Sequence, residues 1–379
     1  MVLIQDARGV FLFEDALITQ RKGIVNIPKT MKAAVLFERG DLRVVEKPVP
    51  QLEAGEALLK VESIAICGSD PAIIADGFPY QPPMGEFIPG HEFTGTVVDV
   101  APDVSEVSPG DRVAIEPHKG CGRCVNCLRG LYTTCLNYGN NEKGHRHYGW
   151  SSNGGYAEYA SVHVNCLHKL PDNISFDEGA LLTTAGTVLY GYERLGWIRP
   201  GETVVVIGPG AIGILSAHLA KILGAGKVIL TGTREDRLSV GRQLGADVTL
   251  NVREANVQQI VMNLTDHIGA DIVVECSGNP QAAAEALEIA RKNGRISFTG
   301  IYHQPVNLPL DRIVQGNLTI TAPKAEGMWN LERALPLLAD CRLNVKPLIT
   351  HTFPLEEINT ALEIFTQRIG GAIKVIIHP

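Results

Sequence analysis

A glycine turn between two buried strands constrains the fold more than any other part of this sequence. It lies in the stretch TVVVIGPGAIGILSAHLAKILGAGKVILTGT, residues 203–233. The β-branched run 203–207 is typical of a strand covered on both faces in a parallel sheet, and a helical pattern over 214–223 and a second strand over 227–231 follow. In this context the spacing G-x-G-x-x-G allows a tight bend and the close approach of a pyrophosphate to a helix N-terminus. The sequence therefore predicts a dinucleotide-binding turn made of Gly208, Gly210, Ala211, Ile212 and Gly213.

Further strand-like runs and helical patterns follow this turn. The strand-like runs cover residues 247–250, 271–275, 295–299 and 318–321, and helical patterns such as 280–291 separate them. Six strands that alternate with helices are the inventory of a doubly wound α/β dinucleotide-binding domain, which we expect over residues 186–321. Ser277, with Gly278, follows the fourth strand, and carboxyl ends of strands face the ligand in such sheets. We therefore expect Ser277 to contact the cofactor.

The end of the second strand indicates which cofactor binds. Domains of this type usually carry Asp or Glu there to hydrogen-bond the adenosine ribose 2′-hydroxyl, but this chain has Gly232, Thr233 and Arg234. A 2′-phosphate then meets no carboxylate, and a hydroxyl and a guanidinium are available to hold it. This interpretation favours NADP. The alternative is NAD, with Glu235 or Asp236 turned toward the ribose, or with Arg234 as a solvated charge.

Four cysteines are packed into GCGRCVNCLRGLYTTC, residues 120–135. Cys121, Cys124, Cys127 and Cys135 have the spacing C-x2-C-x2-C-x7-C, which lets four thiolates converge tetrahedrally on one Zn2+. Four thiolates leave no open coordination position, so we interpret the site as structural. Eight cysteines in 379 residues are too few for a disulfide scaffold, which leaves four unrelated loop thiols as the alternative.

A second group of potential ligands lies upstream, in Cys67-Gly68-Ser69-Asp70 and Gly90-His91-Glu92. Thiolate, imidazole and carboxylate are the ligand types of a zinc ion that keeps one exchangeable position. Taken singly, Cys67 and His91 are as readily explained as a packed core thiol and a buried histidine. Together they indicate a catalytic metal site.

Composition and charge exclude several classes of protein. The chain is 45% apolar and 20% charged, which is typical of a globular protein large enough for two domains. A net charge of −7 gives no electrostatic footprint for nucleic acid. No apolar run is long enough to span a membrane, and Asp6, Glu14 and Asp15 are atypical of a leader peptide. We therefore expect a cytoplasmic protein whose partners are small molecules.

Three motifs agree in order with a known family. "AICGSD" with "PGHEFTG", the four-cysteine stretch and "VIGPGAIG" resemble the zinc-containing medium-chain dehydrogenases, of the alcohol and polyol (sorbitol-type) group, from Met31 to Pro379. The resemblance implies a GroES-like, mainly β catalytic domain over 31–185 with a zinc lobe at 118–137, the Rossmann domain over 186–321, and a return to the catalytic domain over 322–379. It also implies two zinc ions per chain and a homodimer or homotetramer. Residues 1–30 precede the usual start and are assigned no function.

The same resemblance implies roles for individual residues. Cys67 and His91 become ligands of a catalytic zinc, with Glu92 as a third or a switching ligand. Asp70 becomes the partner that orients the histidine, and Ser69 becomes the group that hydrogen-bonds the substrate oxygen and passes on its proton. Lys374, in "GAIKVII", resembles the basic residue near the pyrophosphate, with a surface lysine as the alternative.

The chain departs from the family pattern at two places. Thr183 and Thr184 stand where the family commonly has Cys or Glu near the zinc, and a neutral hydroxyl is a poor ligand beside thiolate and imidazole. Ala72 stands where a histidine often hands the proton to solvent. Water, or His145 or His147 from "KGHRHYGW", would have to replace it, although such histidines are more often solvated loop residues.

Three functional hypotheses follow. The first is a zinc-dependent, NADP-preferring dehydrogenase that transfers hydride between the cofactor and a secondary alcohol of a polyol, sugar alcohol or cyclitol, or the matching ketone. The second is an amino-alcohol dehydrogenase of the threonine type. The third is a non-catalytic dinucleotide-binding zinc protein, against which the presence of Cys67, Ser69, His91 and Glu92 argues.

Overall fold

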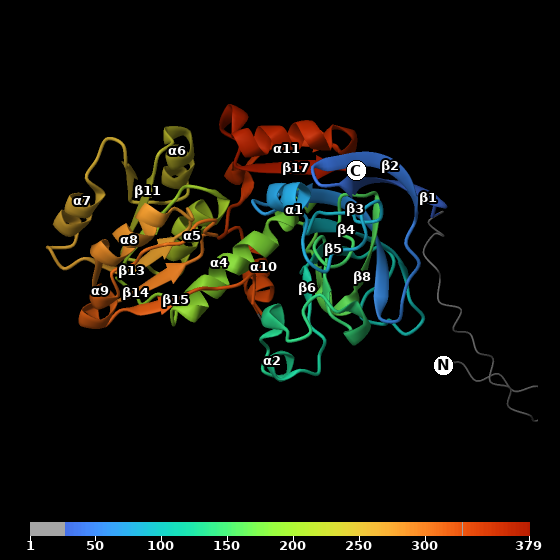
Figure 1. The fold of residues 1–379 in the computed structure, drawn as a ribbon, viewed down its shortest axis with the longest axis horizontal. Helices are drawn as coiled ribbons and strands as arrows, with labels where there is room; N and C mark the ends of the chain where they lie inside the picture. Colours follow the sequence, from blue (N-terminus) through green and yellow to red (C-terminus); the bar gives the residue numbers. More distant parts are fainter. Residues whose placement is uncertain (1–26, 328) are drawn as a thin grey trace, which may run out of the picture.

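The computed structural model describes residues 27–327 and 329–379. Two large β-sheets organise these residues, one on each side of the paired helices α4 and α10 (Figure 1). The greater part of the N-terminal segment 1–30, which was assigned no function, lies outside the described residues. No helix among the described residues is long and apolar enough to cross a membrane.

The first large sheet is parallel and has the strand order β12-β11-β10-β13-β14-β15. This order confirms the doubly wound α/β fold, in which the chain turns back at β10 and the two halves of the sheet extend in opposite directions. The strands are β10 (Thr203–Ile207), β11 (Lys227–Gly232), β12 (Val248–Asn251), β13 (Ala270–Glu275), β14 (Ala290–Phe298) and β15 (Thr319–Thr321). The connecting helices are α5 (Ala211–Ile222), α6 (Glu235–Gln243), α7 (Val257–Leu264), α8 (Pro280–Ile289) and α9 (Leu310–Gly316).

The predicted boundaries differ most from the structure around β14. The helical pattern was expected to continue to residue 291, but α8 ends at Ile289 and Ala290 already pairs with Ala270 of β13. The pairing then shifts register before Arg295 joins Ile272. Polar residues occupy this irregular stretch, so the periodic apolar signal of a strand begins only after it.

The second large sheet is mixed, and Cys67, His91 and Glu92 lie at or just beyond the ends of two of its neighbouring strands. Its central strands are antiparallel, and the late strand β17 pairs with β3, so the end of the chain returns to this sheet. Its strands are β3 (Glu56–Ala65), β4 (Glu92–Val100), β5 (Arg112–Ile115), β8 (Tyr159–His163), β9 (Leu167–Lys169), β16 (Ile349–Pro354) and β17 (Lys374–His378).

Smaller elements surround the two sheets. Two hairpins are β1 (Thr30–Glu38) with β2 (Asp41–Pro48), and β6 (His118–Lys119) with β7 (Arg146–His147). The remaining helices are α1 (Asp70–Asp76), α2 (Val125–Leu128), α3 (Phe176–Ala180), α4 (Leu182–Arg194), α10 (Asn330–Ala339) and α11 (Ile358–Gln367). Short 3-10 helices are η1 (Tyr132–Thr134), η2 (Asn141–Lys143), η3 (Val164–Cys166), η4 (Lys346–Leu348), η5 (Leu355–Glu357) and η6 (Ile369–Gly371).

Helix α4 runs without interruption across the expected domain boundary at 185/186. It packs against α10, and its buried residues share one hydrophobic cluster with the parallel sheet. Leu189 of α4 and Val204 of β10 belong to this cluster, as does Ala65 of β3. We propose that the two domains meet along α4 rather than at a flexible linker.

Gly213 and Gly210 offer a matched test of the glycine turn. A Cβ on Gly213 would lie 1.8 Å from the carbonyl oxygen of Gly208, whereas a Cβ on Gly210 would meet no atom within 4 Å. We expect Gly213→Ala to lower the free energy of unfolding by about 1–3 kcal/mol because the backbone must move. Gly210→Ala is expected to change it by less than about 0.5 kcal/mol. Thermal unfolding of the cofactor-free protein measures both, and equal changes would contradict the close packing at Gly213.

Candidate active site

Strand pairing brings Cys67 and His91 together. Ala65, at the end of β3, pairs with Glu92, at the start of β4, so the residues just beyond this antiparallel pair share one end of the sheet. One potential ligand atom from each of Cys67, His91 and Glu92 lies within 4.8 Å of the others. His91 and Glu92 are buried and Cys67 is partly buried. The trio predicted from the sequence therefore forms one compact cluster, which we call the Cys67 cluster.

Asp70 supports this cluster from the first turn of α1. Its Oδ2 accepts hydrogen bonds from the backbone N–H of Cys67, at 2.8 Å, and from the hydroxyl of Tyr156, at 2.7 Å. Its Oδ1 lies 3.3 Å from Nδ1 of His91, as an ion pair without hydrogen-bond geometry. Burial raises the pKa of Asp70, but His91 and these donors outweigh burial and lower it. Asp70 therefore remains a carboxylate that turns Nδ1 of His91 away from the cluster.

Both carboxylate oxygens of Glu92 are engaged by residues distant in sequence. Thr184 at the start of α4 donates to Oε1 at 3.2 Å, and the ammonium of Lys374 in β17 donates to Oε2. Lys374 is therefore not the surface lysine that was the alternative: its side chain is 4% exposed and pairs with Glu92 and the carbonyl of Ile66. The resemblance gave the residue type but not this partner, because the partner lies 282 residues away.

The charges around the Cys67 cluster suit a divalent cation. Three acidic groups, Cys67, Asp70 and Glu92, face Lys374 and the imidazole of His91. Burial lowers the pKa of His91, but Cys67 and Asp70 outweigh burial and raise it well above its usual value. The cluster therefore attracts positive charge, and its thiolate, imidazole and carboxylate donors are those that Zn2+ takes when one position stays open. The residues fit a zinc ion of the catalytic kind.

The other residues expected near this cluster differ in their exposure and in their hydrogen-bond partners. Ser69 is partly buried directly before α1, and Ala72 is exposed on that helix. Thr183 donates to the carbonyl of Ile115 at 3.1 Å. Thr183 thus makes a structural contact, while Thr184 contacts Glu92, so neither threonine hydroxyl takes the place of the family's acidic or thiol side chain.

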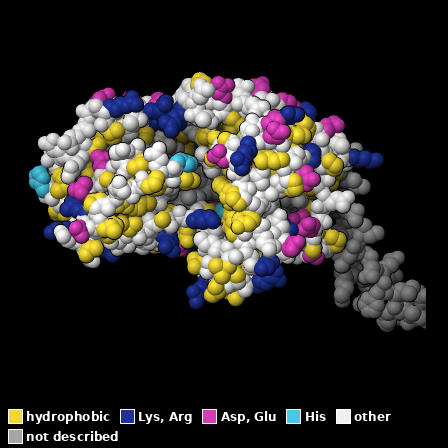
Figure 2. Space-filling model, in the orientation of Figure 1, with side chains coloured by type: hydrophobic (Ala, Val, Ile, Leu, Met, Phe, Trp, Pro, Cys, Tyr) yellow, Lys and Arg dark blue, Asp and Glu magenta, His cyan; other side chains and the backbone are white. Residues whose placement is uncertain are grey.

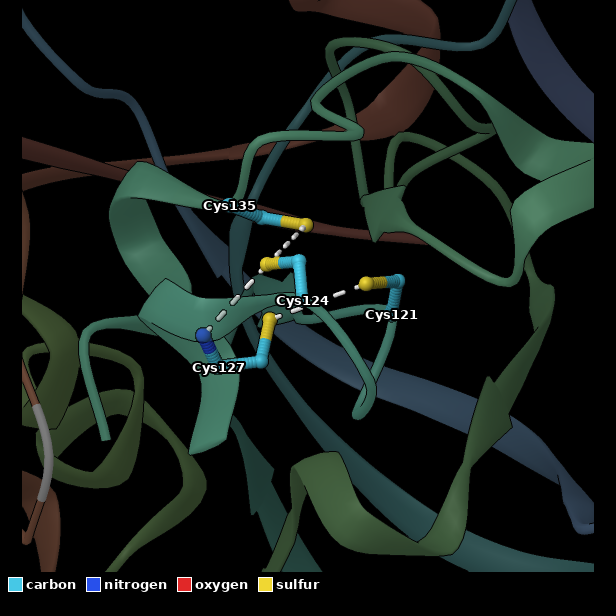
Figure 3. Close-up of side chains that lie close together, drawn as sticks. All are labelled: Cys121, Cys124, Cys127 and Cys135. Atoms are coloured by element: carbon cyan, nitrogen blue, oxygen red, sulfur yellow. Dashed lines mark hydrogen bonds between the residues drawn. The ribbon is translucent and has the colours of Figure 1, made fainter. Parts of the chain in front are cut away.

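The four cysteines of residues 121–135 converge as the spacing predicts. Figure 3 shows their sulfur atoms pointing toward one another, and all four lie within 4.8 Å of each other. Cys121 and Cys127, and likewise Cys124 and Cys135, have Sγ atoms 3.9 Å apart. A Zn–S bond of about 2.3 Å places tetrahedral sulfurs roughly 3.8 Å apart, so the spacing fits one zinc ion.

Hydrogen bonds to the cysteine lobe favour thiolates. Nδ2 of Asn137 donates to Sγ of Cys121 at 3.2 Å. Burial raises the pKa of Cys121, but the backbone N–H of Arg123 and the amide of Asn137 outweigh burial and lower it to about 6. Backbone N–H donors likewise lower the pKa of Cys124, whereas burial raises the pKa of Cys127 and Cys135, so Cys121 and Cys124 are the thiols that ionise first.

The glycine turn lies at the carboxyl end of β10, as predicted. Gly208 has a φ of 99°, which favours glycine, and a Cβ there would lie 2.9 Å from Cβ of Ser277. Gly210 is the N-cap of α5, and the space beside it is open. Gly208, Gly210, Ala211, Ile212, Gly213 and Ser277 thus gather at one edge of the parallel sheet, where a pyrophosphate fits against the helix N-terminus.

Basic side chains surround the end of β11. Gly232 is the last residue of β11 and lies beside the ring of Pro209, and Thr233 and Arg234 then lead into α6. Arg237, which the sequence reasoning missed, is buried; its Nη2 donates to the carbonyl of Ala372, and its Nε has no hydrogen-bond partner among the described residues. Burial, followed by the charges of Arg368 and Arg234, lowers the pKa of Arg237 to about 10. Figure 2 shows basic side chains gathered over α6, beside the hollow between the two halves of the molecule.

The acidic residues that offered the NAD alternative are held elsewhere. Glu235 pairs with Arg242, and Oδ1 of Asp236 accepts a hydrogen bond from the backbone N–H of Arg237 at 2.9 Å. The spacing of Arg234 and Arg237, three residues apart on one helix, is the sequence signal that identifies the second arginine.

Three buried histidines lie near one another, and one of them, His147, contacts His91 of the Cys67 cluster. His118 in β6 pairs in register with His147 in β7, and these residues and His145 are all buried. The structure thus corrects the view of His145 and His147 as solvated loop residues. His145 and His147 alternate with Arg146 in the sequence. This alternation is typical of a strand, in which alternate side chains lie on the same face. His118 carried no such signal, because its partner strand lies beyond the cysteine lobe.

Known proteins resemble this chain in sequence and in fold. Residues 53–172 match the model of the alcohol dehydrogenase GroES-like domain, and residues 211–338 match that of the zinc-binding dehydrogenase. A sorbitol dehydrogenase from Halalkalibacterium halodurans is 33% identical, over 92% of this chain and 99% of that protein. An L-threonine 3-dehydrogenase from Bacillus subtilis is 33% identical, over 89% and 94% respectively. A putative zinc-binding dehydrogenase from Sinorhizobium meliloti, bound to NADP, superimposes with a TM-score of 0.84 at 27% identity, covering 93% of this chain and 100% of that one.

Asp70 and Tyr156 provide a test of the Cys67 cluster as a metal site. Asp70→Asn removes the charge facing His91, and we expect zinc affinity at this cluster to fall about 10–100-fold. Tyr156→Phe leaves the carboxylate in place and is expected to weaken zinc binding much less. Competition with a chelator measures both affinities. Equal affinities in the two variants would show that Asp70 does not act through the histidine.

Proposed function

The chain belongs to the zinc-containing medium-chain dehydrogenases of the polyol dehydrogenase group, and from this premise we propose its substrate and cofactor. The proposed reaction transfers a hydride between NADP and a secondary alcohol of a polyol, sugar alcohol or cyclitol, or the matching ketone. The observation that carries this proposal is the Cys67 cluster, whose ligand atoms lie within 4.8 Å of one another beside Asp70. The sorbitol dehydrogenase relative supports a polyol as the substrate.

In this mechanism Cys67, His91 and Glu92 would hold the catalytic zinc, and Asp70 fixes the imidazole through Nδ1, which leaves Nε2 free to serve as the ligand atom. Zinc supplies Lewis acidity, which lowers the pKa of a substrate hydroxyl, and the nicotinamide supplies the hydride acceptor. Thr184 and Lys374 restrain Glu92, so the strength of its contact with the metal depends on these two partners.

The remaining step is removal of the hydroxyl proton. The Ser69 hydroxyl accepts this proton from the substrate and passes its own to water, while the carbon delivers its hydride to the cofactor and becomes a carbonyl. Because Ala72 is exposed on α1 and carries no titratable group, water takes the place of the histidine relay.

The preference for NADP rests on the end of β11. Gly232 brings no carboxylate there, and Arg234 and Arg368 lie near enough to Arg237 for their charges to lower its pKa. Guanidinium groups bind phosphate oxygens through planar, charge-assisted hydrogen bonds. The pairing of Glu235 with Arg242 further favours a 2′-phosphate over a bare ribose hydroxyl.

Zinc content combined with turnover tests the proposed reaction. We expect two zinc ions per wild-type chain, and one each in Cys67→Ser and Cys124→Ser. Cys67→Ser should lose at least about 100-fold in kcat/KM with little change in melting temperature, because it removes a catalytic ligand. Cys124→Ser should chiefly lower the melting temperature, because the lobe loses its structural metal.

The measurements are elemental analysis, thermal unfolding and nicotinamide absorbance with sorbitol, xylitol, myo-inositol and L-threonine. A wild-type protein with a single zinc, held by the cysteine lobe, would contradict the proposed mechanism. Turnover of L-threonine in preference to all three polyols would instead identify the amino-alcohol reaction.

Arg234 and Arg242 test the cofactor preference on one helix. We expect Arg234→Ala to lower kcat/KM for NADP about 10–100-fold, because a charge-assisted contact with the 2′-phosphate is lost, and for NAD by less than about threefold. Arg242→Ala leaves the Arg234 guanidinium in place but releases Glu235, so we expect a smaller loss with NADP than in Arg234→Ala and a gain with NAD. Equal losses for both cofactors in Arg234→Ala would remove this arginine from 2′-phosphate recognition.

A further inference from the structure

Three aromatic side chains form a stack beside the Cys67 cluster. The rings of His118 and His147 have centroids 3.8 Å apart and an interplanar angle of 25°. The rings of His147 and Trp150 follow at 5.0 Å and 9°. The register of β6 with β7 produces the first contact, and the turn after β7 returns Trp150 over the same histidine.

This stack adjoins a proposed zinc ligand directly. His91 contacts His147 with ring centroids 6.3 Å apart and contacts Trp150 at 6.0 Å. His145 joins the group through Tyr138, whose ring lies 4.6 Å from that of His145 and 5.7 Å from that of His147. A substrate whose reacting carbon lies at the Cys67 cluster would therefore extend along these rings.

The hydrogen bonds of His145 define its tautomer. Its Nδ1 accepts the backbone N–H of Gly139 at 3.1 Å. Burial, then the charges of His118 and Lys324, lowers its pKa to about 4, so the ring is neutral and carries its proton on Nε2. This Nε2–H is buried and has no hydrogen-bond partner among the described residues.

His118 and Trp150 leave two further buried atoms without partners. Nδ1 of His118 lies 2.7 Å from Oε1 of Glu326, and its buried Nε2 has no hydrogen-bond partner among the described residues. Nε1–H of Trp150 is a donor that nothing in the described chain accepts. A buried polar atom without a partner destabilises the folded protein, so these three atoms favour a ligand or water that satisfies them.

We propose that His118, His145 and Trp150 recognise substrate hydroxyls away from the reacting carbon, and so select uncharged, polyhydroxylated alcohols over simple secondary alcohols and phosphate esters. This inference rests on the proposed function. A hydroxyl both donates and accepts, so it can satisfy the unpartnered N–H groups of His145 and Trp150 and, in either protonation state, Nε2 of His118. A phosphate dianion only accepts, and it would meet the buried Glu326 carboxylate that pairs with His118. The amine of Lys324, which could attract a phosphate, lies over the Tyr138 ring, 4.2 Å from its centroid.

Three conservative variants remove one hydrogen-bonding atom each. Asn at position 145 or 118 keeps a group in the place of Nδ1, so His145→Asn and His118→Asn delete only the Nε2 end of each ring. Trp150→Phe keeps an aromatic ring and deletes Nε1–H. His163→Asn is the matched control, because Nδ1 of His163 accepts the N–H of Asn165, outside the stack. Melting temperatures identify any variant that fails to fold.

The measured quantity is the ratio of kcat/KM for the best of sorbitol, xylitol and myo-inositol to kcat/KM for 2-butanol, with the zinc-loaded enzyme and NADP. We expect this ratio to fall about tenfold in each of the three variants and to stay unchanged in His163→Asn. Calorimetry of the same polyol with the zinc-loaded enzyme should show a parallel loss of affinity. The wild-type enzyme should also prefer sorbitol to sorbitol 6-phosphate.

An unchanged ratio in all three variants, with polyol turnover intact, would overturn the inference and leave the proposed function standing. Preference for the phosphate ester would overturn it as well. If the wild type oxidises none of these alcohols with NADP or NAD, the proposed function fails, and calorimetry then decides the inference: polyol binding that the three variants weaken supports it, and the absence of binding overturns it.

Discussion

The buried carboxylate of Glu92 is the interaction on which the rest of the molecule depends. It sits at the start of β4, receives a hydrogen bond from α4 and pairs with a lysine of the late strand β17. A carboxylate removed from water is strongly unfavourable unless it is paired, so these three segments must meet for the sheet to form around it. The same contact ties the mixed sheet to the helix that leads into the parallel sheet. The Glu92 carboxylate thus belongs both to the proposed metal site and to the packing around the mixed sheet.

Much of the fold was predictable because its signals are local. The β-branched run of β10, the glycine spacing and the apolar pattern of α5 lie within one short stretch, and the observed strand order follows from the rules of such sheets. The irregular start of β14 was not predictable, because its pairing with β13 is set by tertiary contact rather than by periodicity.

The sequence predicted the ligand residues of the site, but it did not predict most of the residues that contact them. Cys67 and His91 each follow or precede a strand, so strand pairing explains their meeting once the sheet is known. The position of Lys374, the burial of Arg237 and the stack around His147 depend on side chains brought together across long sequence separations. No periodic pattern reports such contacts. Residue types in motifs therefore indicated the chemistry, while the structure was needed to assign their neighbours.

The pairing of β17 with β3 also affects how the protein is made. Glu92 leaves the ribosome 282 residues before its lysine partner, an interval of roughly 15 s to a minute at typical rates of synthesis. Throughout this interval the nascent mixed sheet lacks β17, the strand that lies between β16 and β3, and the charge that neutralises its buried acid. Co-translational folding can complete the parallel sheet first, and the catalytic half closes only after the last strand has emerged. The late lysine thus delays assembly of the metal cluster until the nucleotide-binding half already exists.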